Sequence, residues 1–375
     1  MQLRKLNLLL LALFLSYSMI FPAAATAADG KVQKITLQEA VEMALQHDQG
    51  VKKAEVEVRS TEALRDNVAD NVKSIPPQGW AAPDPVTATK VQATWVNLLS
   101  SDLAWRMSKK NLEATRDTLV LKVCKSYWDV QVAQEKLSLQ EKLMQQAIKK
   151  LQEARAGQRA GTLSPAEIVM AEAQWEQAKK NYEAARQNLN DAYNTFNNMV
   201  DLLPDERPLL VDTPDYQPLN INSLDAEVDR VLTESPAVWA AKQQIDIKKW
   251  ASDIIYDSQG NVIPYKSRQA EVEAAEYDYA SAKTAMEKAT RALYYQTKSL
   301  EESYGTALEA LRMAEEALRV EKAKYAAGMS TQTKVFEAEV NVAQAQEAVD
   351  ELIRNHAYLK LAFEKPWAMQ TASGN

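Results

Sequence analysis

Two long stretches of the chain carry apolar residues at helical spacing and almost no residue that breaks a helix. Residues 101–156 contain neither glycine nor proline. At ~1.5 Å per residue such a helix spans roughly 80 to 90 Å, more than a compact domain needs. A second stretch, from about Lys266 to Ala327, is interrupted only by Gly305. The pattern predicts two rod-like helices.

Each rod is followed by a short turn and a further helix. The turns are Arg159-Ala-Gly-Thr-Leu-Ser-Pro-Ala-Glu-Ile-Val-Met-Ala171 and Tyr325-Ala-Ala-Gly-Met-Ser-Thr-Gln-Thr-Lys-Val-Phe-Glu-Ala338. Aligning Gly161 with Gly328, at an offset of 167 in sequence number, also pairs Ser164 with Thr331, Ile168 with Val335 and Ala171 with Ala338. We interpret the two motifs as one repeated helix-turn-helix tip.

The helix after the first turn has a clear start signal. Ser164, Pro165 and Glu167 form a Ser-x-x-Glu capping box with proline at the first helical position. This helix should end near Leu203, and the last helix of the chain near Lys365.

The duplication extends beyond the tips. A helix is expected from Thr36 to about Asp70, with Thr36 and Glu39 as a capping box at its start. Its apolar positions recur in the second half, where Leu37, Val41, Leu45, Val51 and Ala54 correspond to Leu224, Val228, Leu232, Val238 and Ala241 at an offset of 187. The offset falls to 167 at the tips, so the first half holds about twenty additional residues between its helices.

Those residues fall in an interruption with several prolines. The prolines in residues 73–85 exclude a regular helix or strand there. The residues that follow, Val86 to Val96, are compatible with one strand or with a helix entry. The corresponding interruption in the second half, residues 254–264, is typical of a small hairpin about Gly260. Between the halves, residues 204–222 hold four prolines and read either as an ordered crossover or as a loose linker.

The expected fold class is mainly α, with two tandem repeats of long antiparallel helical hairpins of the α-barrel or coiled-coil type and at most small β-hairpins. The expected boundaries are a signal peptide (1–27), a first helical repeat (28–203), a proline-rich crossover (204–222), a second helical repeat (223–367) and a C-terminal tail (368–375).

The N-terminus predicts export to the cell envelope. Arg4 and Lys5 precede an apolar run from Leu6 to Phe21 and a small-residue cleavage site ending at Ala27. An uncleaved anchor is less favoured, because the run is shorter than the ~20 apolar residues of a spanning helix. The single cysteine, Cys124, can form no disulfide within the chain.

Composition argues against several classes of function. The formal net charge of −7 disfavours nucleic-acid binding, which requires a basic face. The two histidines, His47 and His356, have no sequence-near partner for metal or nucleophilic chemistry, and no glycine-rich phosphate loop is present. We therefore expect no catalytic residue, metal or cofactor, and no enzymatic activity. A lipid-surface protein is disfavoured, because the rods lack long apolar faces with basic flanks.

The tip motifs, together with Ser126-Tyr-Trp-Asp-Val-Gln-Val-Ala-Gln134 and the proline-rich crossover, give the chain a resemblance to the TolC-like outer-membrane efflux protein family. Tyr127 and Tyr294 lie at the same offset of 167 as the tips. The resemblance covers nearly all of the chain after the signal. It implies a homotrimer whose paired helices form a hollow twelve-helix barrel, a β-barrel in the outer membrane, and tips that dock on a periplasmic adaptor.

The sequence departs from this family where membrane strands are expected. Such strands need ~9 to 11 alternating residues each, and neither interruption provides two of them. We therefore expect a shortened member with small caps opposite the tips, exported to the envelope, whose outer-membrane location is implied only by the resemblance.

The resemblance implies an adaptor-binding surface at the tips, whose candidate residues are Arg159, Gly161, Thr162, Ser164, Lys324, Gly328, Ser330 and Thr331. A purely structural interpretation stays open, because glycine commonly ends helices and a basic last turn suits the helix dipole. The second tip has Lys334 where the first has Glu167.

Four aromatic residues, Tyr127, Trp128, Tyr294 and Tyr295, are expected to pack between rods. The leading hypothesis for function is an oligomeric conduit in an export or efflux system. The alternative is an envelope scaffold that has lost transport.

Overall fold

The computed structural model describes residues 33–72, 84–252 and 263–372. All of its helices and strands lie in one compact unit, residues 34–375. The expected signal peptide, residues 73–83 and the hairpin expected about Gly260 lie outside the described residues. No described helix is both long enough and apolar enough to cross a membrane.

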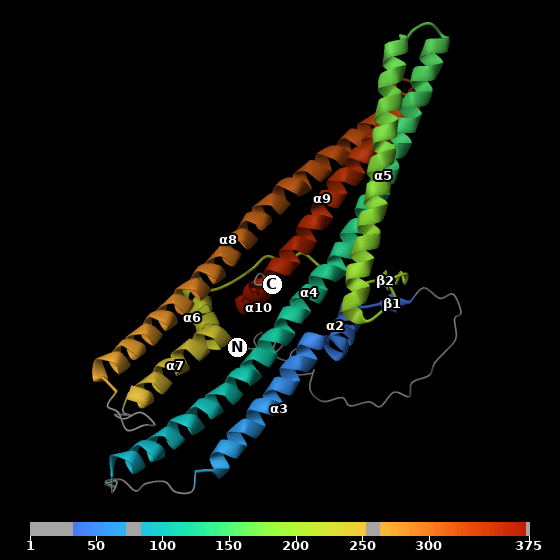
Figure 1. The fold of residues 1–375 in the computed structure, drawn as a ribbon. Coiled ribbons are helices and arrows are strands. Elements are labelled where there is room, and N and C mark those ends of the chain that lie inside the picture. The colour runs from blue at the N-terminus through green and yellow to red at the C-terminus, as the bar shows by residue number, and fades with distance from the viewer. Residues whose placement is uncertain (1–32, 73–83, 253–262, 373–375) are drawn as a thin grey trace, which may run out of the picture. The chain divides into compact units, whose positions relative to one another are not determined.

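The described part of the chain is mainly α, which confirms the predicted fold class. The first half contains β1 (Lys34–Ile35), α2 (Leu37–His47), α3 (Gln49–Asp70), α4 (Pro85–Arg159) and α5 (Pro165–Val200). The second half contains β2 (Leu209–Leu210), α6 (Leu224–Glu234), α7 (Pro236–Ser252), α8 (Tyr265–Ala326), α9 (Gln332–Glu364) and α10 (Pro366–Ala372) (Figure 1).

The first rod is longer than its sequence suggests, and the second has the expected length and is more regular. Helix α4 has 75 residues and begins at Pro85, where the Asp84 carboxylate accepts a hydrogen bond from the Thr87 amide. Residues 86–96 are therefore a helix entry and not a strand. Helix α8 has 62 residues and continues through Gly305 without a break. One glycine costs a helix about 1 kcal/mol, which packing along a rod of this length readily offsets.

The helix expected over residues 36–70 is two helices. The chain is extended at Asp48, whose carboxylate caps α3 by accepting a 2.7 Å hydrogen bond from the Val51 amide. In the second half α6 ends at Glu234 and α7 begins at Pro236, with buried Ser235 between them. Asp48 and Ser235 correspond at the same offset of 187 as the helices around them, so the duplication reproduces the break as well.

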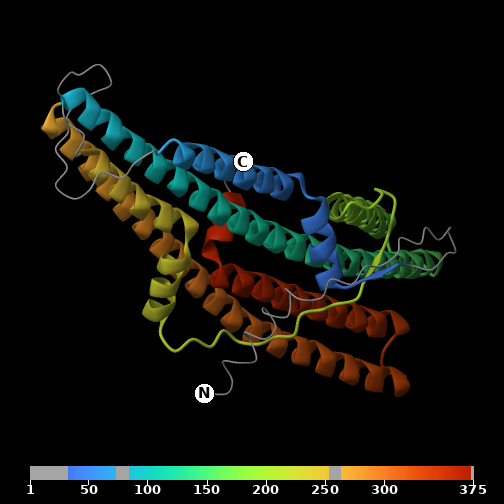
Figure 2. The ribbon, with the colours of Figure 1, turned by 90° about the horizontal axis from the view of Figure 1, so that it is seen from below.

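The four longest helices pack in the order α5, α4, α9 and α8, with α3 against α4 and α7 against α8 (Figures 1 and 2). One apolar core lies mainly in the first half and includes Val123, Tyr127 and Phe196. A second lies mainly in the other half and includes Met286 and Phe363. The ends of the two hairpins lie at the same end of this arrangement.

The aromatic residues expected between rods behave differently from one another. Tyr127 is fully buried, accepts a 3.0 Å hydrogen bond from the Asp212 amide and donates one of 2.8 Å to the Ile35 carbonyl. Trp128 is also buried, and Tyr294 packs against the second core. Tyr295 is 61% exposed, so it does not pack between the rods of a single chain, and the prediction was wrong in this respect.

The proline-rich crossover is ordered and packed. Its strand β2 pairs in parallel with β1, in the register Lys34 to Leu209 and Ile35 to Leu210. Further along, the Tyr216 ring stacks on Tyr304 at 3.8 Å between centroids, and the Leu219 amide donates to Glu301. At the C-terminus, Ala368, where a tail is expected to begin, is buried within α10.

Candidate functional site: the two helical tips

The first tip, residues 157–167, turns the chain from α4 into α5. Gly161 has a left-handed backbone conformation, with φ of 72°. Its amide donates to the Gln158 carbonyl at 2.9 Å, and the Thr162 amide donates to the Gly157 carbonyl at 2.9 Å. These two bonds form a Schellman motif, which satisfies carbonyls at the helix end and needs a residue that tolerates positive φ.

The second tip, residues 324–334, repeats this backbone geometry. Gly328 has φ of 73°, and its amide donates to the Tyr325 carbonyl at 2.9 Å. The Met329 amide donates to the Lys324 carbonyl at 2.8 Å. Both bonds correspond to those of the first tip at an offset of 167, so the repeated sequence motif is a repeated backbone structure.

The helices that leave the tips are capped differently. The Ser164 hydroxyl accepts from the Glu167 amide, while the Glu167 carboxylate accepts from the Ser164 amide at 2.7 Å. Thr331 caps α9 in the same way by accepting from the Lys334 amide at 3.3 Å. A lysine cannot accept in return, so only the first tip has the reciprocal capping box.

The interior of each tip also differs. In the first tip Leu163 lies close against Gly157, where an added Cβ would come within 2.7 Å of the leucine side chain. In the second tip the equivalent positions are Ser330 and Lys324, and the Ser330 hydroxyl donates to the Glu321 carboxylate. An apolar contact in one tip is thus replaced by a hydrogen bond to a charged group in the other.

Charged groups are distributed unequally between the tips. Arg159 is exposed and has no ion-pair partner in the described part of the chain. Lys324 pairs with Glu321 at 3.3 Å. The Ser330 hydroxyl, followed by Lys324, holds the pKa of Glu321 below its usual range, and the Ser164 amide and hydroxyl do the same for the pKa of Glu167.

Large apolar side chains are exposed at both tips, and sequence reasoning did not identify them. Val169 and Met170 on α5 are 64% and 62% exposed, and Met329 is 74% exposed. Tyr325 is also exposed. The sequence offers one signal for them. Ile168 and Ala338 are the buried apolar positions of the two outgoing helices, and the exposed apolar residues lie outside the helical spacing that these two positions begin. Exposed apolar groups beside charged ones are typical of a protein-binding surface.

The eight candidate residues therefore form two separate groups of four, one at each tip. Below the tips, the helices of the two hairpins contact each other. There the Lys150 ammonium of α4 lies 2.9 Å from the Glu337 carboxylate of α9. The nearby Lys149 lies over the Phe336 ring at 3.5 Å.

The remaining reactive side chains are buried or paired with a carboxylate. Burial raises the pKa of the Cys124 thiol to about 11, which disfavours the nucleophilic thiolate. His356 is buried, with Nε2 3.2 Å from the Glu301 carboxylate, and His47 pairs with Asp201 at 2.8 Å. No group of three residues of the His, Cys, Asp or Glu types is placed to hold a metal ion among the described residues.

Comparison with known proteins defines the class of this protein. The sequence profile of the outer membrane efflux protein family matches residues 101–200 and 254–355, one segment in each repeat and together more than half of the chain. The chain belongs to the outer membrane efflux protein family, as its resemblance predicted. Proteins of this family are non-enzymatic transport proteins, in agreement with the expectation of no enzymatic activity. A comparison with curated proteins gives no match.

Solved structures share the fold. The outer-membrane channel OprN is 14% identical, with 88% of this chain and 90% of that chain covered and a TM-score of 0.64. The open-state MtrE outer membrane channel of Neisseria gonorrhoeae is 16% identical, with 88% of both chains covered and a TM-score of 0.62. The CmeC outer membrane channel of Campylobacter jejuni is 12% identical, with coverages of 93% and 94% and a TM-score of 0.60.

Proposed function

We propose that this protein is an oligomeric conduit component of an export or efflux system in the cell envelope. In this proposal copies of the chain, three by family resemblance, surround a lumen with their long helices. The tips then dock on a periplasmic adaptor protein.

The observation that carries the proposal is the matched pair of tips at the ends of the longest helices. Both tips have the same two backbone hydrogen bonds and the same positive φ, although their side chains differ. A duplicated surface of this kind presents two similar sites per copy at one end of the assembly. Membership in the outer membrane efflux protein family supports the transport role.

The chemistry of the tips favours a protein partner. Met329, Val169 and Met170 provide apolar contact area, and Arg159 provides an exposed cation without an ion-pair partner in the described part of the chain. An adaptor with small apolar pockets and an acidic group would complement this surface.

Substitution at a tip tests the docking step. The test uses a strain that lacks the natural gene and accumulates a compound that it can no longer export. Expression of the unchanged protein should remove this accumulation, whereas expression of Met329→Asp should leave most of it in place. Leu64→Asp is the matched control, because Leu64 is a 61% exposed apolar residue on α3, away from both tips. Normal export by Met329→Asp would contradict adaptor docking at the second tip.

Mass measurement tests the oligomer. The full-length protein should form a discrete oligomer in detergent, and a strict monomer both with and without detergent would contradict a conduit. An oligomer whose tip variants all leave export unchanged would favour the scaffold alternative.

A further inference from the structure

A groove lies where α4, α5 and α9 meet, away from both tips. Its walls include apolar side chains of two helices, such as Val132 and Leu139 of α4 and Ala185 of α5, and α9 contributes the Glu347 carboxylate. The cavity volume is about 520 Å³. Small-molecule sites in proteins are clefts of roughly 300–1,000 Å³ with mostly apolar walls and a few polar groups. This cavity is called the Glu347 groove below.

The Glu347 carboxylate is largely buried and incompletely bound. The side chain is 16% exposed, and its Oε1 atom has no hydrogen-bond partner in the described part of the chain. The Lys136 ammonium lies 3.8 Å from Oε1, beyond hydrogen-bond distance, and binds the Glu351 carboxylate at 3.0 Å. By contrast, the Asp129 carboxylate in the same groove is bound by Lys125 at 2.7 Å. A buried acceptor without a donor costs free energy until a donor reaches it.

The charged groups around Glu347 leave one negative charge in excess. The Arg354 guanidinium donates two hydrogen bonds to the Glu135 carboxylate, and Lys136 binds Glu351. Two cations are thus engaged with two carboxylates, and Glu347 has no cation of its own. The α5 wall contributes alanines and amides to the groove. The last torsion of a glutamate is soft, so either carboxylate oxygen can turn toward a ligand in the groove.

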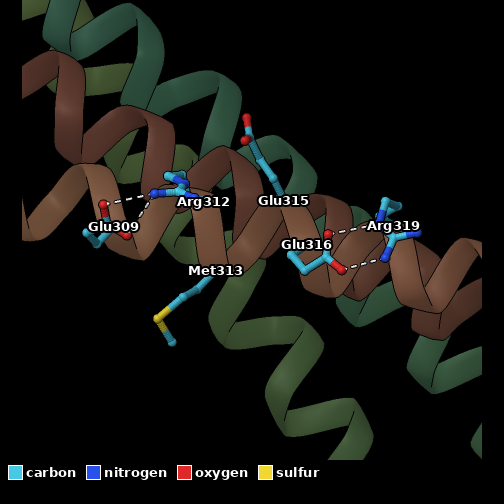
Figure 3. Close-up of a pocket in the computed structure, with 6 residues that line it drawn as sticks. All are labelled: Glu309, Arg312, Met313, Glu315, Glu316 and Arg319. Carbon is cyan, nitrogen blue, oxygen red and sulfur yellow. Dashed lines mark hydrogen bonds and ion pairs between the residues drawn. The ribbon is translucent and has the colours of Figure 1, made fainter.

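A larger hollow on α8 lacks this combination of features. Its volume is about 720 Å³, but all of its lining residues come from α8 (Figure 3). Glu309 and Glu316 each bind an arginine of the same helix, Arg312 at 3.2 Å and Arg319 at 2.6 Å. These carboxylates already have cations, and no second helix provides an apolar wall. The α8 surface therefore serves as a control for the Glu347 groove.

We propose that the Glu347 groove binds small organic cations, which carry a protonated amine on an apolar or aromatic body. The ammonium supplies the donor and the positive charge that Glu347 lacks, and the apolar body lies against the walls of α4 and α5. The bound compound contacts both repeats, because α4 and α5 belong to the first and α9 to the second. This inference goes beyond the proposed conduit and does not depend on docking at the tips.

Protonation of Glu347 should release the bound cation. Burial is the largest cause that raises the pKa of Glu347, Lys136 and Arg354 oppose it, and the Glu351 and Glu135 carboxylates add to it. The carboxylate therefore accepts a proton above the usual value of 4.5, and affinity for a cation should fall as the pH is lowered through the raised value. An alkyl amine such as that of lysine stays protonated over this range.

Calorimetric titration of the full-length protein in an uncharged detergent tests the proposal. The probe is the naphthylmethylammonium ion, and naphthylmethanol is a neutral control of nearly the same shape. After correction for detergent alone, the cation should bind roughly tenfold or more tightly than the alcohol at neutral pH, as expected for one hydrogen bond to a charged group. Acidification should weaken binding of the cation and leave binding of the alcohol unchanged.

Four variants locate the site. Glu347→Gln keeps the shape of the side chain and removes its charge, so it should weaken binding of the cation roughly tenfold or more and abolish the pH dependence. Glu316→Gln removes one charge from the α8 surface of Figure 3 and should change the affinity by less than about twofold. Ala184→Trp fills the groove from α5 and should weaken binding of both probes. Ala173→Trp, at another exposed alanine of α5 that does not line the groove, should not.

The outcomes separate the parts of the proposal. Equal affinities for the cation and the alcohol, or equal losses in Glu347→Gln and Glu316→Gln, would overturn the role of Glu347. Unchanged binding by Ala184→Trp would overturn the location. Failure of both probes to bind the unchanged protein would overturn the site as a whole and leave the conduit standing.

Discussion

The two tips show how one backbone structure can be maintained with different side chains. Both end a rod with a glycine at positive φ and the same pair of hydrogen bonds. The first tip then adds a reciprocal capping box and the contact of Leu163 with Gly157, while the second adds Ser330 bound to Glu321. Two copies of a turn therefore keep the backbone that defines chain direction and differ in the side-chain contacts that support it.

The largest expected effect concerns the feature that the tips share. Gly161→Ala and Gly328→Ala should each destabilise the protein by about 1 kcal/mol, because a left-handed conformation costs a non-glycine residue about 1–2 kcal/mol and a less flexible unfolded chain returns part of it. Nothing lies within 4 Å of either added Cβ, so the two losses should agree. Thermal unfolding measures them.

Gly305→Ala is the control for these variants. It lies inside α8, also has nothing within 4 Å of an added Cβ, and should stabilise the protein by about 0.5–1 kcal/mol. Unequal losses at the two tip glycines would show that the tips do not share one backbone structure in solution.

The difference between the two cap variants should be a smaller effect. Ser164→Ala should cost about 1 kcal/mol, because it removes the hydroxyl that accepts from the Glu167 amide at the start of α5. Thr331→Ala should cost less, because the Ser164 hydroxyl also donates to the Glu167 carboxylate at 2.9 Å, whereas Lys334 at the second tip has no acceptor for such a bond. Chemical denaturation of both variants gives the comparison, and an equal or larger loss for Thr331→Ala would contradict it.

The contact between Leu163 and Gly157 should produce an effect that only the first tip can show. Gly157→Ala alone should change stability by less than about 1 kcal/mol, because the gain in helix propensity is offset by the 2.7 Å approach to Leu163. In a Leu163→Ala background the same change should become clearly stabilising. A double-mutant cycle measures this coupling, and simple additivity would refute it.

The smallest effect concerns protonation. The stabilisation that accompanies a lowered pKa is present above the usual carboxyl value of 4.5 and is lost as the pH falls through the lowered value. Ser330→Ala removes the largest cause at Glu321, so the pKa of this carboxyl should rise toward 4.5. Ser164→Ala should move the pKa of Glu167 less, because the backbone amide remains. Carbon-13 NMR titration of the carboxyl groups compares the two shifts, and a larger shift at Glu167 would contradict the assignment of causes.

Local signals in the sequence were sufficient for the rods, the tips and the capping boxes. Glycine, proline and the Ser-x-x-Glu pattern act within a few residues, so Gly161, Gly328 and Ser164 could be placed without a structure. The breaks at Asp48 and Ser235 were missed, because both positions lie within an apolar helical pattern. At the second break, Pro236 directly after Ser235 was an available signal for a helix start.

Contacts between distant residues were beyond the sequence. Nothing in the pattern connects Glu321 to Ser330 across the second tip, or Tyr127 to Asp212 across the crossover. Tyr294 and Tyr295 show a further difficulty, because neighbours on a helix point about 100° apart and only the packing decides which of them is buried.

The pairing of β1 with β2 has a consequence for the order of folding during synthesis. Ile35, among the first described residues, pairs with Leu210, and its carbonyl accepts from the Val211 amide and from the Tyr127 hydroxyl. The same hydroxyl accepts from the Asp212 amide. The Leu37 amide donates a hydrogen bond to the Asp212 carboxylate, which lies far along the chain beyond the first repeat. The first repeat can therefore form its helices early but can complete its core only after the crossover has been synthesised, which couples maturation of the N-terminal half to the start of the second.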